Sequence, residues 1–472
     1  MKLKNIIHYS GLVTKERNVI NLERHLYQKQ TENQAKPKIK FANNFQRITE
    51  HIKDYLKQDQ YKSILRNSFG DKSKHKRLRE IIYSHISSKD FLEEYKAYIA
   101  DYSPDEVADY LVEKIAGLDV LQPLVDIPTV TDINCMDWDN IWVDDIFKGE
   151  YKTDISFESE TEYLELCNRF AYASSKPYSY SKPSVDAVFP NLRVNFVGQD
   201  LSPKVSLSIR IISKKVRLNE ELMLETGYAN KTMISLLRAT FARESHLISG
   251  ATGTGKTELL RYFTKYTENN GIIIMIEDTP ETYLDELYPE KPIRMWKNRE
   301  ATDDDKKEFG YSFHIRNAMR QKPKYIMIQE SRGKESLQIL KAAESGHVVS
   351  TTLHSENAID SIDRFIDLCE EAQQHDPAYY GKRITKKFGI GIHVDRFGEK
   401  NVRKISQIVE YIGYEKNKTI TNVLFEYDPI TEKHIQKSKM SQKLWNRLQQ
   451  VHGLLPELKE LAPIENNEMQ LA

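Results

Sequence analysis

Eight consecutive residues have the composition and spacing of a loop that binds phosphate: Gly250-Ala251-Thr252-Gly253-Thr254-Gly255-Lys256-Thr257. The glycines let backbone N–H groups approach phosphate oxygens without an intervening Cβ atom. We expect the ammonium of Lys256 at the β- and γ-phosphates and the hydroxyl of Thr257 at Mg²⁺. The pattern predicts that the chain binds a nucleoside triphosphate.

The segments on either side of the loop fit that role. The apolar run Leu247–Ser249 predicts a strand that enters the loop, and residues Glu258–Phe263 have helical spacing after it. A strand–loop–helix unit is the context that the motif requires, whereas an ordinary glycine-rich turn does not need it. The flanks therefore favour a nucleotide site over a simple turn.

Polar side chains follow three further predicted strands. These strands and their polar ends are Gly271–Ile276 with Glu277 and Asp278, Tyr325–Ile328 with Gln329 and Glu330, and Val348–Leu353 with His354. Because ligands bind at the carboxyl ends of strands in open α/β sheets, we expect these side chains near Lys256 and Thr257. Strands that alternate with helical segments predict a doubly wound α/β sheet.

Each of these carboxylates has two interpretations. Glu330 either positions or deprotonates the water that attacks the γ-phosphate, or it is a solvated carboxylate at a strand end. Glu277 and Asp278 either hold metal-bound water or cap the turn at Thr279-Pro280. Their expected position beside the phosphate loop favours the first interpretation of each.

Two histidines flank the last of these strands. His347 and His354 are seven residues apart, which in a strand places their side chains on opposite faces and argues against a shared metal site. Each could be a core histidine with satisfied hydrogen bonds. His354 has the stronger claim to a catalytic role because it lies at the edge that carries the phosphate loop.

Composition limits the class of protein. The chain has 472 residues, enough for roughly three domains. Its 69 basic and 69 acidic side chains cancel, so no overall field favours nucleic acid or anionic membrane. Mean hydropathy is −0.60. The longest apolar run is about six residues, whereas a membrane-spanning helix needs about 20.

The cysteines and the N-terminal residues indicate a cytoplasmic protein. Cys135, Cys167 and Cys369 are odd in number and far apart, which is typical of reduced thiols and not of a disulfide framework or a zinc site. Residues Met1–Asn5 lack the apolar core of a signal peptide.

The region before the loop is expected to contain two further parts. Residues 1–100 are polar, with a linker-like segment at Thr31–Lys38; this extension is either a flexible docking arm or a poorly ordered helical appendage. Its predicted helices are Phe45–Leu56, Arg77–Ile86 and Phe91–Ile99. Residues Ser103–Glu106 form a capping box that predicts a helix start, and Val107, Leu111, Ile115 and Leu118 form its apolar stripe.

An α+β module is predicted between Thr131 and Ile212. Its expected elements are strands at Ile141–Val143, Arg193–Val197 and Val205–Ile212 and a helix at Glu160–Ala173. A helix over Leu218–Ala242 should connect this module to the phosphate loop. The predicted domain limits are 1–100, 101–220, 221–400 and 401–472.

Beyond the core, the sequence predicts a few additional elements. A strand at Ile408–Tyr411 and a hairpin near Lys416–Lys418 should extend the sheet. A terminal helix is expected around Leu444, Leu448 and Val451, and the charged run Asp303–Glu308 is expected in a solvated loop.

The order of the motifs resembles that of the secretion (traffic) ATPases, which power type II and type IV secretion, conjugation and type IV pili. In that family the segments are named Walker A, aspartate box, Walker B and histidine box. Their counterparts here are the phosphate loop, Ile276–Glu281, Gln329–Gly333 and Gly346–His354, with Asn317–Lys324 between the second and third. Pro190–Asn195 and Ser208–Arg210 resemble N-terminal segments whose arginines reach the nucleotide. The resemblance covers roughly residues 110–425.

This resemblance implies a homo-hexameric ring of two-domain subunits. A PAS-like N-terminal domain would precede a RecA-like core, with ATP at the hinge between them. Hydrolysis would rotate one domain against the other and pass that motion to platform proteins in the inner membrane. The protein is then expected in the cytoplasm, associated with the membrane through partners, without direct binding to nucleic acid.

Roles for individual residues also follow from the resemblance. Glu330 is the expected catalytic carboxylate, Glu277 assists at the metal-bound water, and His354 senses the γ-phosphate. Arginines suit phosphate because a guanidinium can bind it in a bidentate manner. The expected nucleotide-binding residues are Gly250, Thr252, Gly253, Thr254, Gly255, Lys256, Thr257, Glu258, Arg193, Arg210, and Arg320 or Arg332. Thr257 is expected at Mg²⁺, and Asp278 near it.

Some positions depart from the family pattern. Gln329 stands where the family usually has glycine, and Lys322 where it often has arginine. The segment Pro190–Arg193 is shorter than the usual run, so Arg193 matches less well than Arg210. Isolated cysteines do not fit the zinc subdomain of the type II branch, and the Thr-Pro after Asp278 favours the conjugation, type IV secretion and tight-adherence-pilus branch.

Two other classes of function compete with the motor. A P-loop translocase that acts directly on DNA should carry a basic groove with interleaved aromatic residues, and neutral net charge counts against it. A scaffold that binds ATP without hydrolysing it would not need Lys256, Thr257 and Glu330 together.

Overall fold

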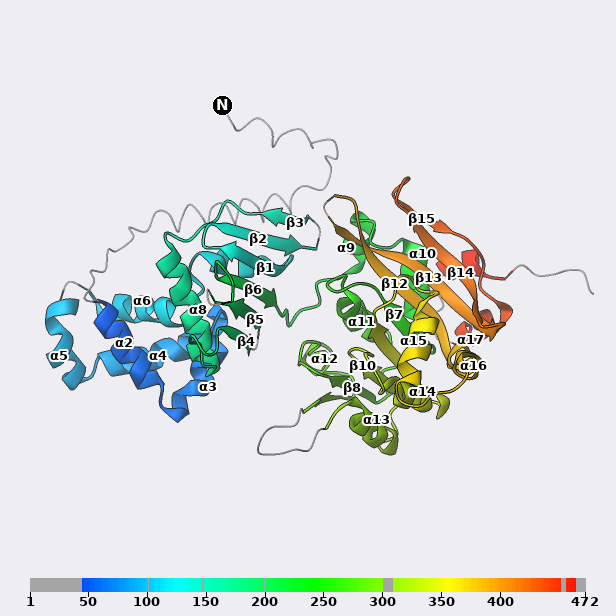
Figure 1. The fold of residues 1–472 in the computed structure, drawn as a ribbon, viewed down its shortest axis with the longest axis horizontal. Coiled ribbons are helices and arrows are strands. Elements are labelled where there is room, and N and C mark those ends of the chain that lie inside the picture. Colours follow the sequence, from blue (N-terminus) through cyan, green and yellow to red (C-terminus); the bar gives the residue numbers. More distant parts are fainter. Residues whose placement is uncertain are drawn as a thin grey trace, which may run out of the picture. The chain divides into compact units, whose positions relative to one another are not determined.

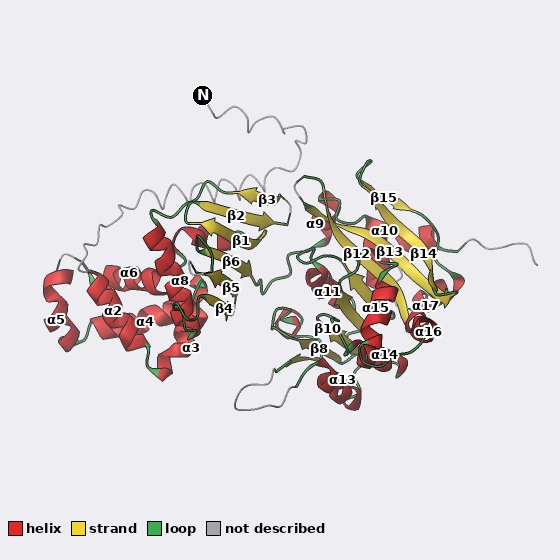
Figure 2. Ribbon diagram, viewed as in Figure 1, coloured by secondary structure: helices red, strands yellow, loops and turns green. Residues whose placement is uncertain are grey.

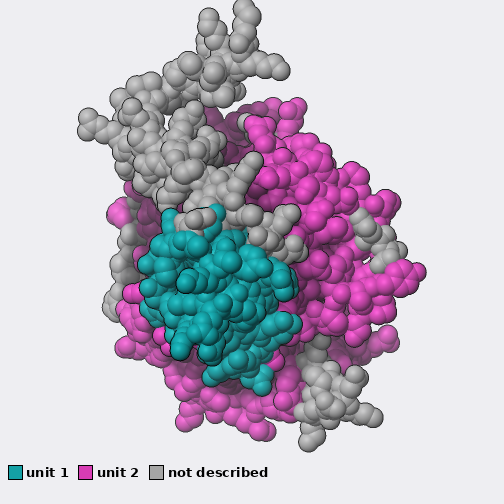
Figure 3. All heavy atoms as spheres, turned by 90° about the vertical axis from the view of Figure 1, so that its left-hand side faces the viewer, with its two compact units in different colours: residues 1–61, 79–115 teal, residues 62–78, 116–472 magenta. Residues whose placement is uncertain are grey.

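The computed structural model describes residues 45–100, 102–146, 148–189, 191–198, 201–299, 309–399, 401–450 and 456–463. The chain divides into two compact units, coloured separately in Figure 3. Described residues of the first unit lie within 45–61 and 79–115, and those of the second within 62–78 and 116–463. The predictions for Thr31–Lys38, Pro190, Asp303–Glu308 and Val451 lie outside the described residues.

The first unit is helical. Its helices, with α3 and α4 running into the second unit, are α2 (Phe45–Leu56), α3 (Asp59–Ser68), α4 (His75–Ile86), α5 (Lys89–Ile99) and α6 (Pro104–Ala116). The capping box is confirmed: the Ser103 amide donates to Glu106 Oε2 (2.9 Å), and Ser103 Oγ accepts from the Glu106 amide (3.3 Å). Helix α3 was not predicted, since only Leu65 and Ser68 of its residues are buried and most of its residues are polar.

The second unit contains an antiparallel sheet of six strands, ordered β3-β2-β1-β6-β5-β4. Helix α8 (Glu160–Ser174) contributes Leu166 and Phe170 to the same buried cluster as the sheet, so the predicted α+β module is confirmed. The strands are β1 (Val130–Asp137), β2 (Asn140–Asp145), β3 (Gly149–Lys152), β4 (Ser184–Val188), β5 (Leu192–Val197) and β6 (Ser206–Ile211). The sequence did not predict β1, β3 and β4, of which β3 and β4 are only four and five residues long.

The core of the second unit is a parallel sheet in the order β12-β7-β11-β10-β8-β9. Figure 1 labels its strands β7, β8, β10 and β12. The strands are β7 (Ser245–Ser249), β8 (Ile273–Glu277), β9 (Ile293–Lys297), β10 (Tyr325–Ile328), β11 (Val348–Leu353) and β12 (Phe388–Phe397). β7, β8 and β10 are buried at every residue, which explains the continuous apolar runs Ile273–Ile276 of β8 and Tyr325–Ile328 of β10. The predicted strands Tyr325–Ile328 and Val348–Leu353 are confirmed with the same limits, as β10 and β11.

Helices cover both faces of this sheet, as Figure 2 shows. Ile273 and Met275 of β8 join one apolar cluster with α10 and α11, whereas Ile274 and Ile276 join another with α13 to α16. The helices are α9 (Glu220–Glu225), α10 (Lys231–Phe241), α11 (Lys256–Thr264), α12 (Leu284–Leu287), α13 (Tyr311–Arg320), α14 (Ser336–Glu344), α15 (Ser361–Glu370) and α16 (Pro377–Lys387). The expected doubly wound α/β core is therefore confirmed.

One helix prediction was wrong. Residues Leu218–Ala242 form two helices, α9 and α10, instead of one. The chain breaks at Gly227, whose φ of 62° lies in the left-handed region, and Asn230 caps the start of α10 through the amide of Met233 (2.9 Å). Helical periodicity runs through both segments and conceals the break.

The C-terminal residues extend the sheet as predicted. Strands β13 (Val402–Glu415), β14 (Lys418–Asp428) and β15 (Lys433–Gln436) continue it in antiparallel order from β12. Lys416 and Asn417 have φ values of 50° and 55°, the two left-handed residues that a tight hairpin turn requires. Helix α17 (Gln442–Leu448) follows. The three cysteines are free and buried.

Candidate functional site

A cavity of about 710 Å³ lies at the carboxyl edge of the parallel strands. Residues of both the core and the antiparallel sheet line it. The expected site residues among them are Arg193, Arg210, Thr252, Gly253, Thr254, Gly255, Lys256, Thr257, Glu258, Asp278, Glu330, Arg332 and His354. Its basic side chains outnumber its acidic ones, which suits a ligand with several negative charges.

The phosphate loop connects β7 to α11 in the predicted strand–loop–helix arrangement. Gly253 and Gly255 have φ values of 76° and 96°, which side chains with a Cβ rarely adopt. Gly250 has φ 146°, and a Cβ there would lie 2.1 Å from the carbonyl oxygen of Val394. The backbone conformation and the neighbouring strand β12 therefore both require glycine in this loop.

Lys256 is buried and folded back onto its own loop. Its Nζ donates to the carbonyl oxygens of Gly250 (2.7 Å) and Ala251 (2.8 Å). Burial lowers the pKa of the ammonium to about 8, an effect that the charge of Glu330 only partly opposes. These two bonds use two of the three N–H donors of the ammonium, and its role in phosphate binding stays a prediction.

Glu330 lies between two basic side chains at the end of β10. Its Oε1 is 3.0 Å from His354 Nε2, and its Oε2 accepts from Arg332 Nη2 at 2.9 Å. Burial tends to raise the pKa of this carboxyl, but Arg332, His354 and Lys256 together hold it below its usual value. Glu330 is therefore ionised and available as a proton acceptor.

His354 links Glu330 to the phosphate loop. Its Nδ1 lies 3.0 Å from the Gly250 carbonyl oxygen, and its Nε2 faces the Glu330 carboxylate. A carbonyl oxygen can only accept, so Nδ1 donates to it. The imidazole therefore bridges the phosphate loop and the Glu330 carboxylate through its two ring nitrogens. His347 lies at the other end of β11, where its Nδ1 contacts the Pro323 carbonyl oxygen (2.8 Å).

Glu277 shapes the loop after β8. It is 2% exposed, and its Oε1 accepts from the amides of Glu281 (3.1 Å) and Thr282 (2.9 Å). Burial raises the pKa of this carboxyl, although the two amides oppose the shift. The contacts match the alternative interpretation in which Glu277 caps the following turn. Its role at metal-bound water stays a prediction.

Asp278 faces the cavity and is held from several sides. Asn298 Nδ2 donates to its carboxylate, and Arg332 Nη1 lies 3.7 Å from Oδ2. The amide of Asp278 donates to Gln329 Oε1 at 2.9 Å. The glutamine that departs from the family pattern thus fastens the segment after β8 to the end of β10.

The expected arginines differ in their placement. Arg210 of β6 and Arg193 of β5 line the cavity; Arg210 Nε donates to Asp132 Oδ1 (3.0 Å), and Arg193 Nε lies 3.7 Å from Asp186 Oδ1. Arg332 also lines it. Arg320 ends α13 with an exposed side chain and is not among the cavity residues.

Sequence reasoning missed three charged residues beside the loop. Arg396 Nη2 and Arg403 Nε donate to the Gly253 carbonyl oxygen at 3.0 and 2.8 Å. Both guanidinium groups also bond Asp144 Oδ2 at 2.7 Å, so the loop is tied to strand β2. Arg396 follows the apolar residues of β12, a strand that runs parallel to β7 and ends at the same edge of the sheet. This position could have identified Arg396 as a site residue from the sequence.

Fold and site together define the class: a P-loop nucleotide-binding protein whose cavity is completed by a preceding α+β module. A family model described as "Type II/IV secretion system protein" matches residues 186–386. An uncharacterized protein of Bacillus anthracis is 32% identical over 324 residues, which are 65% of this chain and 71% of that protein. The chain belongs to the type II/IV secretion system protein family.

Two further relatives carry functional names. The type IV secretion system protein VirB11 of Bartonella quintana is 28% identical over 201 residues, covering 39% of this chain and 55% of VirB11. The type IV pilus retractation ATPase PilT of Pseudomonas aeruginosa is 31% identical over 194 residues, covering 40% of this chain and 50% of PilT. In the described part of this chain, no helix has the length and apolar character needed to cross a membrane.

Proposed function

We propose that this protein is a hexameric motor that hydrolyses ATP to power a type IV secretion, conjugation or pilus-assembly machine at the cytoplasmic membrane. The observation that carries the proposal is the cavity in which Lys256, Glu330 and Arg210 converge from two parts of the second unit. An ATPase site completed by a preceding module couples the state of the nucleotide to the position of that module.

The chain belongs to a family of ATPases, and we assign each step of hydrolysis to one or more of its residues. Lys256, the lysine of the phosphate loop, neutralises charge on the β- and γ-phosphates with its ammonium. Glu330, held ionised by its neighbours, orients and deprotonates the attacking water. His354 lies between Glu330 and the Gly250 carbonyl, where it responds to the γ-phosphate. Arg193 and Arg210 add positive charge from the antiparallel sheet.

The residues present fit a magnesium ion bound with the nucleotide. Among the described residues, no group of three His, Cys, Asp or Glu side chains could hold a metal alone. Magnesium with ATP usually takes only one or two protein ligands and keeps several waters. Thr257 would supply a hydroxyl ligand, with Asp278 near it. When bound, the ion neutralises charge on the phosphates.

The partners follow from the family relationship and the composition. We expect six copies of this chain in a ring, and platform proteins in the membrane that receive the motion. The neutral net charge of the chain supports transfer of force to protein partners over direct binding to nucleic acid.

The decisive test is Glu330→Gln, which keeps the shape of the side chain and removes the base. We expect nucleotide binding within a few fold of wild type and turnover lowered by about two to four orders of magnitude. A mutant that hydrolyses ATP at the wild-type rate would show that Glu330 is not the catalytic base. Absence of hydrolysis by wild-type protein at any concentration would favour the alternative function, a scaffold that binds ATP without hydrolysing it. Light scattering with an ATP analogue tests the ring, and monomers alone would refute it.

A further inference from the structure

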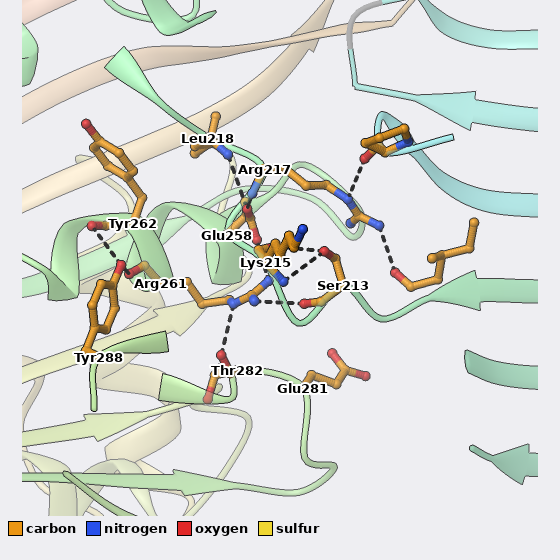
Figure 4. Close-up of polar contacts among 12 residues, drawn as sticks. Ser213, Lys215, Arg217, Leu218, Glu258, Arg261, Tyr262, Glu281, Thr282 and Tyr288 are labelled. Carbon is orange, nitrogen blue, oxygen red and sulfur yellow. Dashed lines mark hydrogen bonds and ion pairs between the residues drawn. The ribbon is translucent and has the colours of Figure 1, made fainter. Parts of the chain in front are cut away.

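Residues 212–219 join the antiparallel sheet to the core, and this linker is held from both sides (Figure 4). On the core side it contacts helix α11, which begins at Lys256 of the phosphate loop. On the other side it contacts the sheet that supplies Arg193 and Arg210. The following inference rests on the proposed function and identifies how the two sides are connected.

Glu258 holds the backbone of the linker. Its Oε1 accepts from the amides of Arg217 and Leu218, the latter at 3.3 Å. Its Oε2 accepts from Arg261 Nη1 at 2.7 Å. Glu258 lies in the first turn of α11, two residues after Lys256, so its carboxylate moves with the residues that bind phosphate. With these partners, the carboxylate holds the backbone of the linker, and its contact with the nucleotide stays a prediction.

Arg261 makes a second attachment one turn further along α11. Its side chain is 4% exposed, its Nη2 donates to the Ser213 carbonyl oxygen (2.8 Å), and its Nε donates to the Thr282 carbonyl oxygen (3.0 Å). Thr282 also donates its amide to Glu277, at the end of β8. Arg261 therefore joins the linker to the segment that follows Glu277 and Asp278.

Arg217 makes the attachment to the sheet. Its Nε donates to the Pro128 carbonyl oxygen (3.1 Å), and its Nη2 donates to those of Val130 (3.2 Å) and Ile211 (3.1 Å). Val130 begins β1 and Ile211 ends β6, so one guanidinium fastens the linker to two neighbouring strands. Burial lowers the pKa of Arg217, and the charges of Glu258 and Asp132 oppose this shift only in part.

We propose that Glu258 is a positioning residue that transmits the state of the phosphate loop to the antiparallel sheet through the backbone amides of Arg217 and Leu218. The path runs from the first turn of α11, through the carboxylate and the two amides, to the Arg217 side chain and the strand ends. A shift of the loop on phosphate binding moves Glu258, and Arg217 carries the shift to the sheet. Rotation of the sheet requires the hydrogen bonds from these two amides to Glu258 to change.

Amide hydrogen exchange on the full chain reads the two amides directly. In wild type we expect slow exchange in peptides covering residues 213–219 without nucleotide, and a different rate with ADP and with a non-hydrolysable ATP analogue. In Glu258→Ala we expect exchange faster by about tenfold or more and no response to nucleotide. Unchanged exchange in the mutant would overturn the proposal.

Glu286→Ala is the matched control. Glu286 forms an ion pair with Lys214 of the same linker (2.9 Å), but both side chains are about half exposed and no linker amide bonds Glu286. We expect wild-type exchange and nucleotide response from this variant. A response equal to that of Glu258→Ala would mean that any change near the linker has the same effect, and it would overturn the specific role of Glu258.

Kinetics separate positioning from binding. We expect Glu258→Ala to lower kcat about tenfold or more while KM for ATP changes less than about threefold. Glu258→Gln keeps an oxygen that accepts from the two amides, so it should restore most of the protection and activity. If Glu258→Ala does not fold, the glutamine variant provides the test. The proposal is contradicted if its two linker amides stay protected from exchange but no longer respond to nucleotide.

Failure of this inference and failure of the proposed function give different results. The exchange experiment with ADP needs no turnover, so it tests the connection through Glu258 even if the wild-type protein hydrolyses no ATP. Normal hydrolysis with an unresponsive linker in wild type would leave the ATPase intact and remove the transmission path.

Discussion

The carboxylate of Glu330 and the imidazole of His354 lie 3.0 Å apart at the ends of neighbouring strands β10 and β11. The same imidazole contacts the Gly250 carbonyl oxygen, at the start of the phosphate loop. A base at one strand end is thus connected to the loop through the next strand, and the pair should act as a unit in hydrolysis.

A double-mutant cycle tests this unit. We expect Glu330→Gln and His354→Gln each to lower kcat, and the double mutant to be little worse than Glu330→Gln, because both residues serve the same step. His347→Gln, at the other end of β11, is the control and should retain wild-type turnover. Steady-state ATPase rates measure all four. Full additivity of the two losses would show that the residues act separately.

The lowered pKa of Lys256 predicts proton uptake on nucleotide binding. Without nucleotide the folded protein releases this proton at about pH 8, whereas bound phosphates favour the charged ammonium. Affinity for ADP should therefore fall as pH rises above about 8, by up to about tenfold per pH unit. The unfolded chain keeps the proton to about pH 10, so stability without nucleotide should rise over the same window.

Calorimetry at pH 8.5 in two buffers with different ionisation enthalpies measures this uptake, with EDTA present to exclude metal effects. The comparison at pH 6.5, where Lys256 is charged in both states, should show no uptake from this group. Equal heats in the two buffers at pH 8.5 would contradict the prediction.

Asp144 balances the charges of two arginines, the buried Arg403 and the partly buried Arg396. Asp144→Ala leaves the guanidinium groups of Arg396 and Arg403 without their shared carboxylate, and we expect a loss of about 3–5 kcal/mol in the free energy of unfolding. Glu150→Ala is the control: Glu150 bonds Arg396 from an exposed position, so its loss should cost about 0–1 kcal/mol. Urea denaturation measures both. Equal losses would show that burial of Asp144 has no special effect.

Gly250 is required by both conformation and space. In Gly250→Ala the new methyl group would meet the Val394 carbonyl oxygen, so we expect the loop to shift, nucleotide binding to fall and the melting temperature to drop. Gly346→Ala has a similarly unfavourable φ of 95° but open space around the Cβ, so it isolates the cost of conformation. Nucleotide affinity should stay near wild type in Gly346→Ala. Retained affinity in Gly250→Ala would show that the loop tolerates the contact.

Local sequence patterns predicted the parts of the fold whose residues are uniformly buried. Strand Tyr325–Ile328 was predicted with its observed limits because a parallel strand covered on both faces is apolar throughout. Strand β1 was missed because register shifts near Val130 and Asp137 interrupt the alternation around its buried Ile133 and Cys135. Pairing between distant segments is not encoded in a local pattern.

The site divides in the same way. The sequence by itself determined the phosphate loop and the polar residues at the ends of the parallel strands, because glycine, lysine and carboxylate chemistry at that spacing has few other uses. Only the tertiary structure decided that Arg403 and Asp144 secure the loop and that Glu258 holds the linker. These contacts join residues about 40 to 260 positions apart, and such distances close only when the sheets fold.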